Sequence, residues 1–464
     1  MDKKFPGKIL ILLAISITAG FLGGHIGLNS KQSLAVSVFL ASVLGTLLFW
    51  DFRLAFVFIG TSVLLITNTI DIEHVITFAS IDVILFLVGM MILVGLLKES
   101  GFFAWVVQLI LRTKNLTARK FVIIISLVAA VLSTMTSEVV SIIFMVAAAL
   151  EICDYFEVDP VPYIIITVIA TNIGSAATVL GNPIGILIAS KAGLTFEDFI
   201  IKAFPLALVS LLAAIFLMLF LYRKAIKELD KNIKDLGANE LLINLISVPI
   251  DKQLRIGLGI FATTIFFIAM HHRIEILLGL KANTILFTIP ILSSGCVMMW
   301  KHKRAREYIE KDVEWWTLLF FVFLFAQAGA LKFTGVTDIF AGSLANYAGN
   351  STGFLIGMVL WISTIGSSLL DNVVLVAAFI PVIQSFGSIN INLQPLWWAL
   401  LFGGCFGGNI TLVGSTANIV ALGILEKEKN IKMTFFRWLG VGFIVGIVTT
   451  SIVWVALLFL PMYR

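Results

Sequence analysis

The sequence predicts an all-α integral membrane protein built from two repeats of inverted topology, each with a re-entrant hairpin and a broken helix. Three observations lead to this fold class. Hydrophobic residues make up 59% of the 464 residues and charged residues only 13%, and the mean hydropathy is +1.06, far outside the range of soluble domains. Apolar windows of membrane-spanning length recur along the chain. Interrupted apolar segments also occur in two similar sets, at a nearly constant separation.

Full spans are predicted from apolar windows of about 17 to 25 residues. They cover residues 7–27, 33–50, 54–70, 81–98, 204–222, 256–271, 283–300, 316–334 and 438–461. The first run is too long for a signal peptide and is followed by further spans, so it is interpreted as a transmembrane helix. Four other apolar segments, 119–153, 161–190, 353–388 and 395–424, carry polar residues, Gly or Pro near their centres. Irregular backbone at membrane depth is tolerated only inside protein or beside water, so these segments predict two hairpins and two broken helices.

Basic residues predict the orientation, because positively charged loops stay in the cytoplasm. If the two hairpins enter and leave on one side and the broken helices cross, every basic cluster lies on the cytoplasmic side. This arrangement gives about 11 crossings plus two hairpins, with a cytoplasmic N-terminus. Short basic clusters between apolar runs fit loops and do not indicate a nucleic-acid partner. The clusters are Lys3, Lys4 and Lys8; Arg112, Lys114, Arg119 and Lys120; Arg223, Lys224, Lys227, Lys231 and Lys234; Lys301, Lys303, Arg304 and Arg306; and Lys427, Lys429 and Lys432.

An internal repeat is visible when the two halves are compared. The segment 94–101 parallels 328–335, and Ser137-Glu138 falls on Asp371-Asn372 at the same separation of 234 residues. A second set of matches is separated by 233 residues: Gly174, Thr178 and Gly181 fall on Gly407, Thr411 and Gly414. By the loop argument the first unit starts outside and the second starts inside. Inverted repeats of this kind hold substrate and coupling ions at their interface near the bilayer midplane.

The predicted organisation follows from the repeat. N-terminal transmembrane helices occupy 1–79, the first repeat 80–222, a cytoplasmic loop 223–254, connecting transmembrane helices 255–313, and the second repeat 314–464. In the first repeat the hairpin is 119–153 and the broken helix 161–190, and in the second they are 353–388 and 395–424. The partner implied by this organisation is the lipid bilayer.

The two hairpin tips, residues 133–138 and 367–372, combine hydroxyls, an amide, one acid each and the free N–H groups of the helix that follows. Such a mixture can coordinate a cation or bind an anion. An ionisable group at membrane depth is a functional hypothesis by default. The alternative for Glu138 and Asp371 is a helix N-cap or a buried hydrogen-bonded acid. The candidate ligands from the tips are Thr136, Ser137, Glu138, Ser368, Asp371 and Asn372.

The two helix breaks, residues 171–183 and 403–418, are rich in Gly, Asn and Thr. Gly and Pro interrupt the helical ladder and free backbone carbonyls, which are natural Na⁺ ligands. The alternatives are close helix packing for the glycines and satisfaction of the broken backbone for the asparagines. The candidates are Asn172, Gly174, Thr178, Gly181 and Asn182 in the first break and Gly408, Asn409, Thr411, Ser415 and Asn418 in the second. Two pseudo-symmetric Na⁺ sites are predicted, at Ser137, Glu138 and Asn182 and at Asp371, Asn372 and Asn418.

Nothing in the sequence indicates an enzyme. The five histidines form no HExxH pattern, the three cysteines have no CxxC spacing, and Gly407-Gly408-Asn409 lacks the Lys-Ser/Thr of a phosphate loop. No cofactor is expected, apart from Na⁺ and/or H⁺ as coupling ions.

Residues 171–178 (TNIGSAAT) and Leu370-Asp371-Asn372 resemble the ArsB/NhaD permease group of the ion transporter superfamily, which contains bacterial Na⁺/H⁺ antiporters, arsenite permeases and the P protein. The similarity runs from about Asp82 to Glu428 and is closest to the P-protein branch. Sodium symporters of divalent anions are more distantly similar. The resemblance implies a homodimer that works by an elevator motion. Two departures concern the first ion site: Ser137-Glu138 stands where the family has Asp-Asn or Asn-Thr, and Ile184 replaces the second proline after Asn182-Pro183.

These features predict a secondary active transporter of a prokaryotic cytoplasmic membrane that works by alternating access. Na⁺/H⁺ exchange, or Na⁺- or H⁺-coupled movement of a small ion, is favoured because two acids at one site would repel an anion. The alternatives are a Na⁺-coupled di- or tricarboxylate symporter and a proton-coupled arsenite or metalloid efflux permease. A passive channel would keep the fold but lose the coupling.

Overall fold

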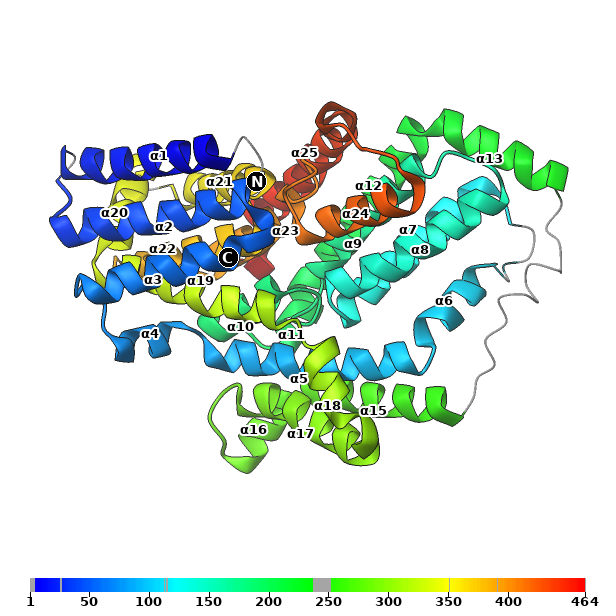
Figure 1. Cartoon of the computed structure of the whole chain (residues 1–464), viewed down its shortest axis with the longest axis horizontal. Coiled ribbons are helices and arrows are strands. Elements are labelled where there is room, and N and C mark those ends of the chain that lie inside the picture. The colour runs from blue at the N-terminus through cyan, green and yellow to red at the C-terminus, as the bar shows by residue number, and fades with distance from the viewer. Residues whose placement is uncertain are drawn as a thin grey trace.

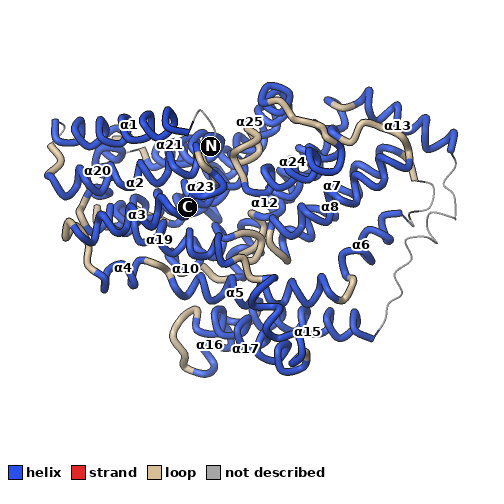
Figure 2. Tube along the Cα trace, in the orientation of Figure 1, coloured by secondary structure: helices blue, strands red, loops and turns tan. Residues whose placement is uncertain are grey.

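The computed structural model describes residues 5–25, 27–111, 113, 116–236, 252–349, 351–389 and 391–463. Within these ranges every regular element is a helix and none is a strand (Figure 2), which confirms the predicted all-α class. The basic residues Lys3, Lys4, Arg112 and Lys114, used above to predict the orientation, lie outside the described residues.

The N-terminal part forms a stack of antiparallel helices at one end of the molecule (Figure 1). It comprises α1 (Phe5–His25), α2 (Ser30–Leu48), the 3₁₀ turn η1 (Trp50–Phe52), α3 (Arg53–Ile66) and α4 (Ile72–Phe78). The predicted span 54–70 is partly wrong, because α3 has only 14 residues, or about 21 Å of length. Its end at Ile66 has a local cause: Asn68 adopts a left-handed φ of 52°, a conformation that stops a helix and that Asn tolerates.

The first repeat unit contains the helix pair and the broken helix that the sequence predicts. Helices α7 (Ala118–Met135) and α8 (Glu138–Tyr155) form hairpin 1, joined by the two-residue turn Thr136-Ser137. Helices α9 (Val161–Ser175) and α10 (Pro183–Ala192) are separated by break 1, residues 176–182. Around them lie α5 (Ile81–Glu99), α6 (Phe102–Leu111), α11 (Phe196–Asp198), η2 (Phe199–Ala203) and α12 (Phe204–Leu221).

Both ends of hairpin 1 are held by one amphipathic helix, α13 (Arg223–Leu236). The Asp230 carboxylate accepts a hydrogen bond from the backbone N–H of Ala118, at the start of α7. The Asn232 side chain donates to the carbonyl of Phe156, just after α8. Both ends of hairpin 1 therefore lie beside α13, at the right of the molecule in Figure 1.

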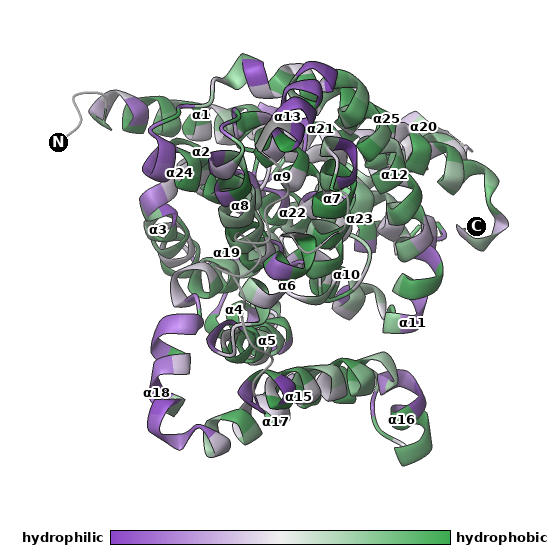
Figure 3. Ribbon diagram, turned by 90° about the vertical axis from the view of Figure 1, so that its right-hand side faces the viewer, coloured by the Kyte–Doolittle hydropathy of each residue, from purple (hydrophilic) through white to green (hydrophobic). Residues whose placement is uncertain are grey.

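The connecting helices form a separate layer on the far side of α5 (Figure 3). They are α15 (Lys252–Ala269), α16 (His271–Leu278), α17 (Thr284–Trp300), η3 (His302–Arg304), α18 (Ala305–Glu307) and η4 (Tyr308–Asp312). Helix α17 approaches α5 closely, because Gly89 has no side chain at the point where the Pro290 backbone passes and Ser294 donates to the Gly89 carbonyl at 2.7 Å.

The second repeat unit has the same order of elements. Helices α21 (Thr352–Leu369) and α22 (Asn372–Gly387) form hairpin 2, with the turn Leu370-Asp371. Helices α23 (Gln394–Gly407) and α24 (Thr416–Lys429) are separated by break 2, residues 408–415. The unit also contains α19 (Trp315–Phe333), α20 (Val336–Ala348), α25 (Phe435–Phe459) and η5 (Pro461–Tyr463).

Nine helices in the described part of the chain are long and apolar enough to cross a membrane, or ten if α17 and the helical segment bent by 104° from it count as one span. These helices do not reach the predicted count of about 11 crossings, because α3, α9, α10 and α22 are each too short to be counted alone. Helices α7 and α21, the first arms of the hairpins, do pass the test. The re-entrant character of the hairpins and the opposite orientation of the two units therefore stay predictions.

Candidate functional site

The tips of the two hairpins meet inside the protein. Glu138 is the first residue of α8 and Asn372 the first of α22, and both are buried. The Asn372 side chain donates to Glu138 Oε1 at 3.4 Å. Each helix starts with a cap: Ser137 Oγ accepts from the N–H of Val140, and Asp371 Oδ1 accepts from the N–H of Val373 at 3.1 Å. Two helix N-termini thus converge on one point, each with an acid at its start.

Each tip is fastened to the break of its own unit by a threonine. Thr178 Oγ1 in break 1 donates to the carbonyl of Thr134 at 2.5 Å, and Thr411 Oγ1 in break 2 donates to the carbonyl of Ser368 at 2.5 Å. The two threonines lie 233 positions apart and the two carbonyls that accept from them 234 apart, the separations found in the sequence repeat. Both predicted threonines are therefore used to hold a hairpin.

A buried amide network joins the two broken helices to each other. Asn172 of α9 donates to the side-chain oxygens of Asn409 and Asn418, at 2.9 Å each. The hydroxyl of Ser415 donates to Asn172 Oδ1 at 3.2 Å. All four side chains have at most 1% of their surface exposed. The two halves of the protein thus share a buried polar centre in which asparagine side chains hydrogen-bond to one another.

Two of the predicted asparagine ligands also satisfy the broken backbone, as the structural alternative proposed. Asn418 donates to the carbonyls of Gly408 and Thr411 at 2.7 and 2.8 Å. Asn182 accepts from the N–H of Gly185 at 2.9 Å and donates to Ser175 Oγ at 2.8 Å. These amides hold the breaks in shape.

Glycines near the ends of α9 and α23, just before the breaks, also have a packing role. A Cβ atom on Gly174 would clash with the backbone of Ala130 in hairpin 1, and a Cβ on Gly407 would clash with the backbone of Thr364 in hairpin 2. The carbonyl of Gly181 accepts the N–H of Glu138 at 3.1 Å. Glycine is therefore required where a hairpin touches a broken helix.

The first predicted Na⁺ set is gathered around one small cavity. Thr136, Ser137, Glu138 and Asn182 all line a small space of about 60 Å³, most of whose remaining lining is apolar. Glu138 Oε2 is buried and has no hydrogen-bond partner among the described residues. The cavity has room for a cation with a water molecule or two.

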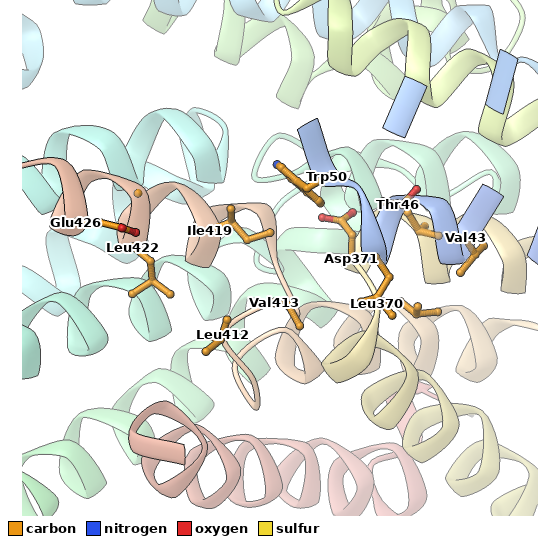
Figure 4. Close-up of a pocket in the computed structure, with 13 residues that line it drawn as sticks. Val43, Thr46, Trp50, Leu370, Asp371, Leu412, Val413, Ile419, Leu422 and Glu426 are labelled. Atoms are coloured by element: carbon orange, nitrogen blue, oxygen red, sulfur yellow. The ribbon is translucent and has the colours of Figure 1, made fainter. Parts of the chain in front are cut away.

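The side chains of the three residues of the second predicted Na⁺ site have different partners. Asn372 reaches Glu138, and Asn418 belongs to the Asn172 network. Asp371 instead accepts a hydrogen bond from Thr416 Oγ1 at 2.7 Å. Asp371 also lines an open cavity of about 370 Å³, into which its carboxylate points beside Trp50 (Figure 4). A site at Asp371 would therefore use different neighbours from those predicted.

Sequence reasoning missed several residues of the site. Thr416 is a near neighbour of Asp371, and Cys405 Sγ accepts from the Asn182 amide at 3.1 Å. Thr46 near the end of α2, Trp50 in η1 and Glu426 in α24 line the open cavity. The only sequence signal for these residues was the position of Thr416 and Cys405 within the second break.

The chain was compared with known protein families and structures. Residues 46–403 match the citrate transporter family (CitMHS). An uncharacterized transporter of Mycobacterium tuberculosis is 31% identical over 371 residues, covering 79% of this chain and 83% of its own. The P protein of Homo sapiens is 28% identical over 459 residues and covers 82% of this chain, whereas this chain covers 54% of the P protein.

The crystal structure of the YdaH transporter of Alcanivorax borkumensis, described as having an unusual topology, is similar in fold. Its TM-score is 0.54 at 14% sequence identity, over 87% of this chain and 90% of that one. The match supports the fold class. The similarity to the P-protein branch of the ion transporter superfamily, expected from the motifs, is confirmed. The chain belongs to the citrate transporter (CitMHS) family of the ion transporter superfamily and is a membrane transporter.

Proposed function

We propose that this protein is a secondary active ion transporter in which the carboxylate of Glu138 binds Na⁺ and H⁺ alternately. The observation that supports this proposal is the buried Glu138 carboxylate between the two hairpin tips, with one oxygen 3.4 Å from Asn372 and the other without a partner among the described residues. A buried carboxylate without compensation is costly, so it either binds a cation or takes up a proton. Because both ligands use the same oxygen, they exclude each other, as exchange requires.

The size of the cavity also favours a small ion at Glu138. The space of about 60 Å³ accepts a cation or water but is well below the 300 Å³ or so of typical organic ligand pockets. Oxygens that could complete the coordination of Na⁺ come from Ser137, Thr136 and Asn182, which line the same space. These are hard oxygen ligands, as Na⁺ prefers.

Access to the site differs between the two acids. Asp371 lines the cavity of about 370 Å³ between α2, α24 and hairpin 2 (Figure 4), while Glu138 lines the much smaller one of about 60 Å³. The end of α2 and the basic end of α24 lie on the predicted cytoplasmic side. In our proposal this conformation is open to the cytoplasm at Asp371, the N-terminus is cytoplasmic, and alternating access carries the loaded tips to the other side of a prokaryotic cytoplasmic membrane. A homodimer and an elevator motion belong to the proposal on the resemblance alone.

A second candidate is cation-coupled transport of a di- or tricarboxylate. Two observations favour it: the match to the citrate transporter family over residues 46–403, and an open cavity of about 370 Å³, which lies within the size range of organic ligand sites. In this version Na⁺ or H⁺ bound at the acids would offset the charge of the carboxylate.

The test uses purified protein in liposomes that contain a pH-sensitive dye and have an acidic lumen. Na⁺ added outside is expected to drive H⁺ out and make the lumen more alkaline. Glu138→Gln is expected to abolish the Na⁺-dependent signal. Glu151→Gln, an exposed acid on the same helix α8, is the matched control and is expected to keep it.

The outcomes separate the two candidates. No pH response to Na⁺ in the native protein would reject cation exchange. Uptake of labelled citrate that requires a Na⁺ or H⁺ gradient would then support the second candidate. A response that Glu138→Gln leaves intact would remove Glu138 from the ion path.

A further inference from the structure

The small cavity at Glu138 and a second cavity lie along the same four helices. The second one, called the outer cavity below, has a volume of about 230 Å³ and is lined by Ser80, Leu187, Lys191, Phe325, Lys332 and Ala377 among others. Helices α5, α10, α19 and α22 contribute lining residues to both cavities. These helices form a closed ring of contacts, because α5 and α22 each pack against both α10 and α19. The two cavities are therefore two levels within one ring of helices.

The two levels are about one helical turn apart. On three helices a residue of the small cavity is followed four positions later by a residue of the outer cavity: Pro183 and Leu187 on α10, Phe321 and Phe325 on α19, and Val373 and Ala377 on α22. On α5, which runs the other way, the lining passes from Phe86 back to Ser80. Four residues of an α-helix rise by about 6 Å, so a thin layer of side chains separates the cavities.

The outer cavity lies on the side of Glu138 that the sequence predicts to be outside. Helix α19 begins just after the basic cluster at 301–306, which is predicted to be cytoplasmic. Phe325 and Lys332 are therefore further from the cytoplasm than Phe321. Thr77, another lining residue, is exposed, so this cavity reaches the protein surface. The open cavity at Asp371 lies on the predicted cytoplasmic side.

The layer between the two levels is apolar and closed. Phe321 and Phe325 are only 5% and 4% exposed, and their rings are stacked, with centroids 5.8 Å apart and planes 13° from parallel. Ile184, Ile186 and Val376, which lie between the two levels on α10 and α22, are fully buried. An apolar constriction offers nothing to replace the hydration shell of an ion, so it stops the ion until it opens.

Beyond the phenylalanine stack the lining becomes polar. Ser80 and Gln384 line the outer cavity, together with Lys191 and Lys332. Lys332 donates to Ser385 Oγ at 3.1 Å and lies 4.0 Å from an oxygen of Asp338. Polar groups allow water to fill this space, while two ammonium groups repel a cation. The outer cavity thus suits the passage of a cation and not its binding.

We propose that the ring of α5, α10, α19 and α22 is the outer access route of the Glu138 site, and that the stacked pair Phe321 and Phe325 closes this route in the present conformation. The pair controls access and does not bind the ion. The inference rests on the proposed cation site at Glu138 and adds the path that joins it to the outer solution. Alternating access then requires the stack to part when the cytoplasmic side is closed.

The test uses a small membrane-impermeant thiol reagent added to the outside of intact cells. In a background without Cys153, Cys296 and Cys405, Val373→Cys reports on the small cavity and Gln384→Cys on the outer one. Gln384→Cys is expected to react whether or not the stack is present. Val373→Cys is expected to react at least about tenfold faster when combined with Phe325→Ala, because a route open in a minor population becomes open in most molecules.

Two variants separate closure of the route from a general loss of packing. Phe323→Ala removes a ring from the same helix that lines neither cavity and packs against Phe58, and it is expected to leave the rate at Val373→Cys unchanged. Phe325→Leu keeps an apolar side chain in the layer and is expected to stay close to the native rate. If Phe325→Ala does not reach the membrane, Phe325→Val takes its place with the same expected direction.

The results decide between the route and the function separately. An unchanged rate at Val373→Cys, an equal rise with Phe323→Ala, or a Gln384→Cys that does not react from outside would overturn the inference. If Na⁺ drives no H⁺ movement in liposomes but Phe325→Ala still exposes Val373→Cys, the outer route is supported and the proposed cation exchange is refuted.

Discussion

Asn172 is expected to be among the polar residues most important for stability, because it joins the two halves of the protein. Its amide donates to Asn409 and Asn418 at 2.9 Å each, and its oxygen accepts from Ser415 at 3.2 Å. Hydrogen bonds between membrane helices contribute about 0.6 kcal/mol each on average, so three give about 2 kcal/mol. Asn172→Ala also leaves two buried amide oxygens without this donor, at about 1 to 3 kcal/mol each. The expected loss is at least about 4 kcal/mol.

The assay is reversible unfolding by SDS in mixed micelles, with the free energy of unfolding extrapolated to zero SDS. Thr167→Val is the matched control: Thr167 is equally buried on the same helix, but its hydroxyl donates only to the Tyr163 carbonyl one turn earlier. That carbonyl keeps its backbone partner, so the control is expected to lose less than about 1 kcal/mol. If Asn172→Ala costs no more than the control, the amide network does not stabilise the interface between the halves.

Two further substitutions test the contacts between hairpins and breaks. Gly407→Ala pushes a methyl group into the backbone of Thr364 and is expected to lower the free energy of unfolding by about 1 to 3 kcal/mol. Gly423 has open space around it, so Gly423→Ala is expected to be neutral or stabilising. Melting temperatures that fall equally in the two variants would contradict this expectation. Thr178→Val removes the bond to the Thr134 carbonyl and is expected to slow transport in liposomes while the protein keeps its fold. An unchanged maximal rate would mean that this bond does not fix the tip.

Much of the fold could be predicted because polar residues at membrane depth are costly and therefore informative. The predicted hairpin 353–388 corresponds to Thr352–Gly387, and the predicted broken helix 161–190 to Val161–Ala192. The predicted span 54–70 was too long for a different reason. Hydropathy alone does not detect a helix that ends early, and the stop at Ile66 depends on the left-handed conformation of Asn68.

The site was harder to predict, because its pairings are tertiary. The composition of the tips and breaks pointed to Glu138 and Asn172, but no local pattern shows that Glu138 meets Asn372 of the other hairpin. Nor does it show that Asn418 accepts a hydrogen bond from Asn172, while Asp371 accepts one from Thr416. Phe321 and Phe325 were overlooked because phenylalanines in an apolar span are typical of any membrane helix. Their position between two cavities is visible only in three dimensions.

The inverted orientation of the two units can be decided by labelling single cysteines from one side of the membrane. In a background without Cys153, Cys296 and Cys405, the ends of hairpin 1 are marked by Arg119→Cys and Glu157→Cys, and those of hairpin 2 by Thr352→Cys and Ser388→Cys. All four positions are exposed.

An impermeant thiol reagent added to intact cells is expected to label the hairpin 2 pair and to reach the hairpin 1 pair only after permeabilisation. The reason is that both ends of hairpin 1 return to α13, whose lysines predict a cytoplasmic position, while the repeat predicts the opposite side for hairpin 2. Labelling of Thr352→Cys and Ser388→Cys from opposite sides would make α21 and α22 a crossing pair. Labelling of all four from the same side would refute the inverted orientation of the two units.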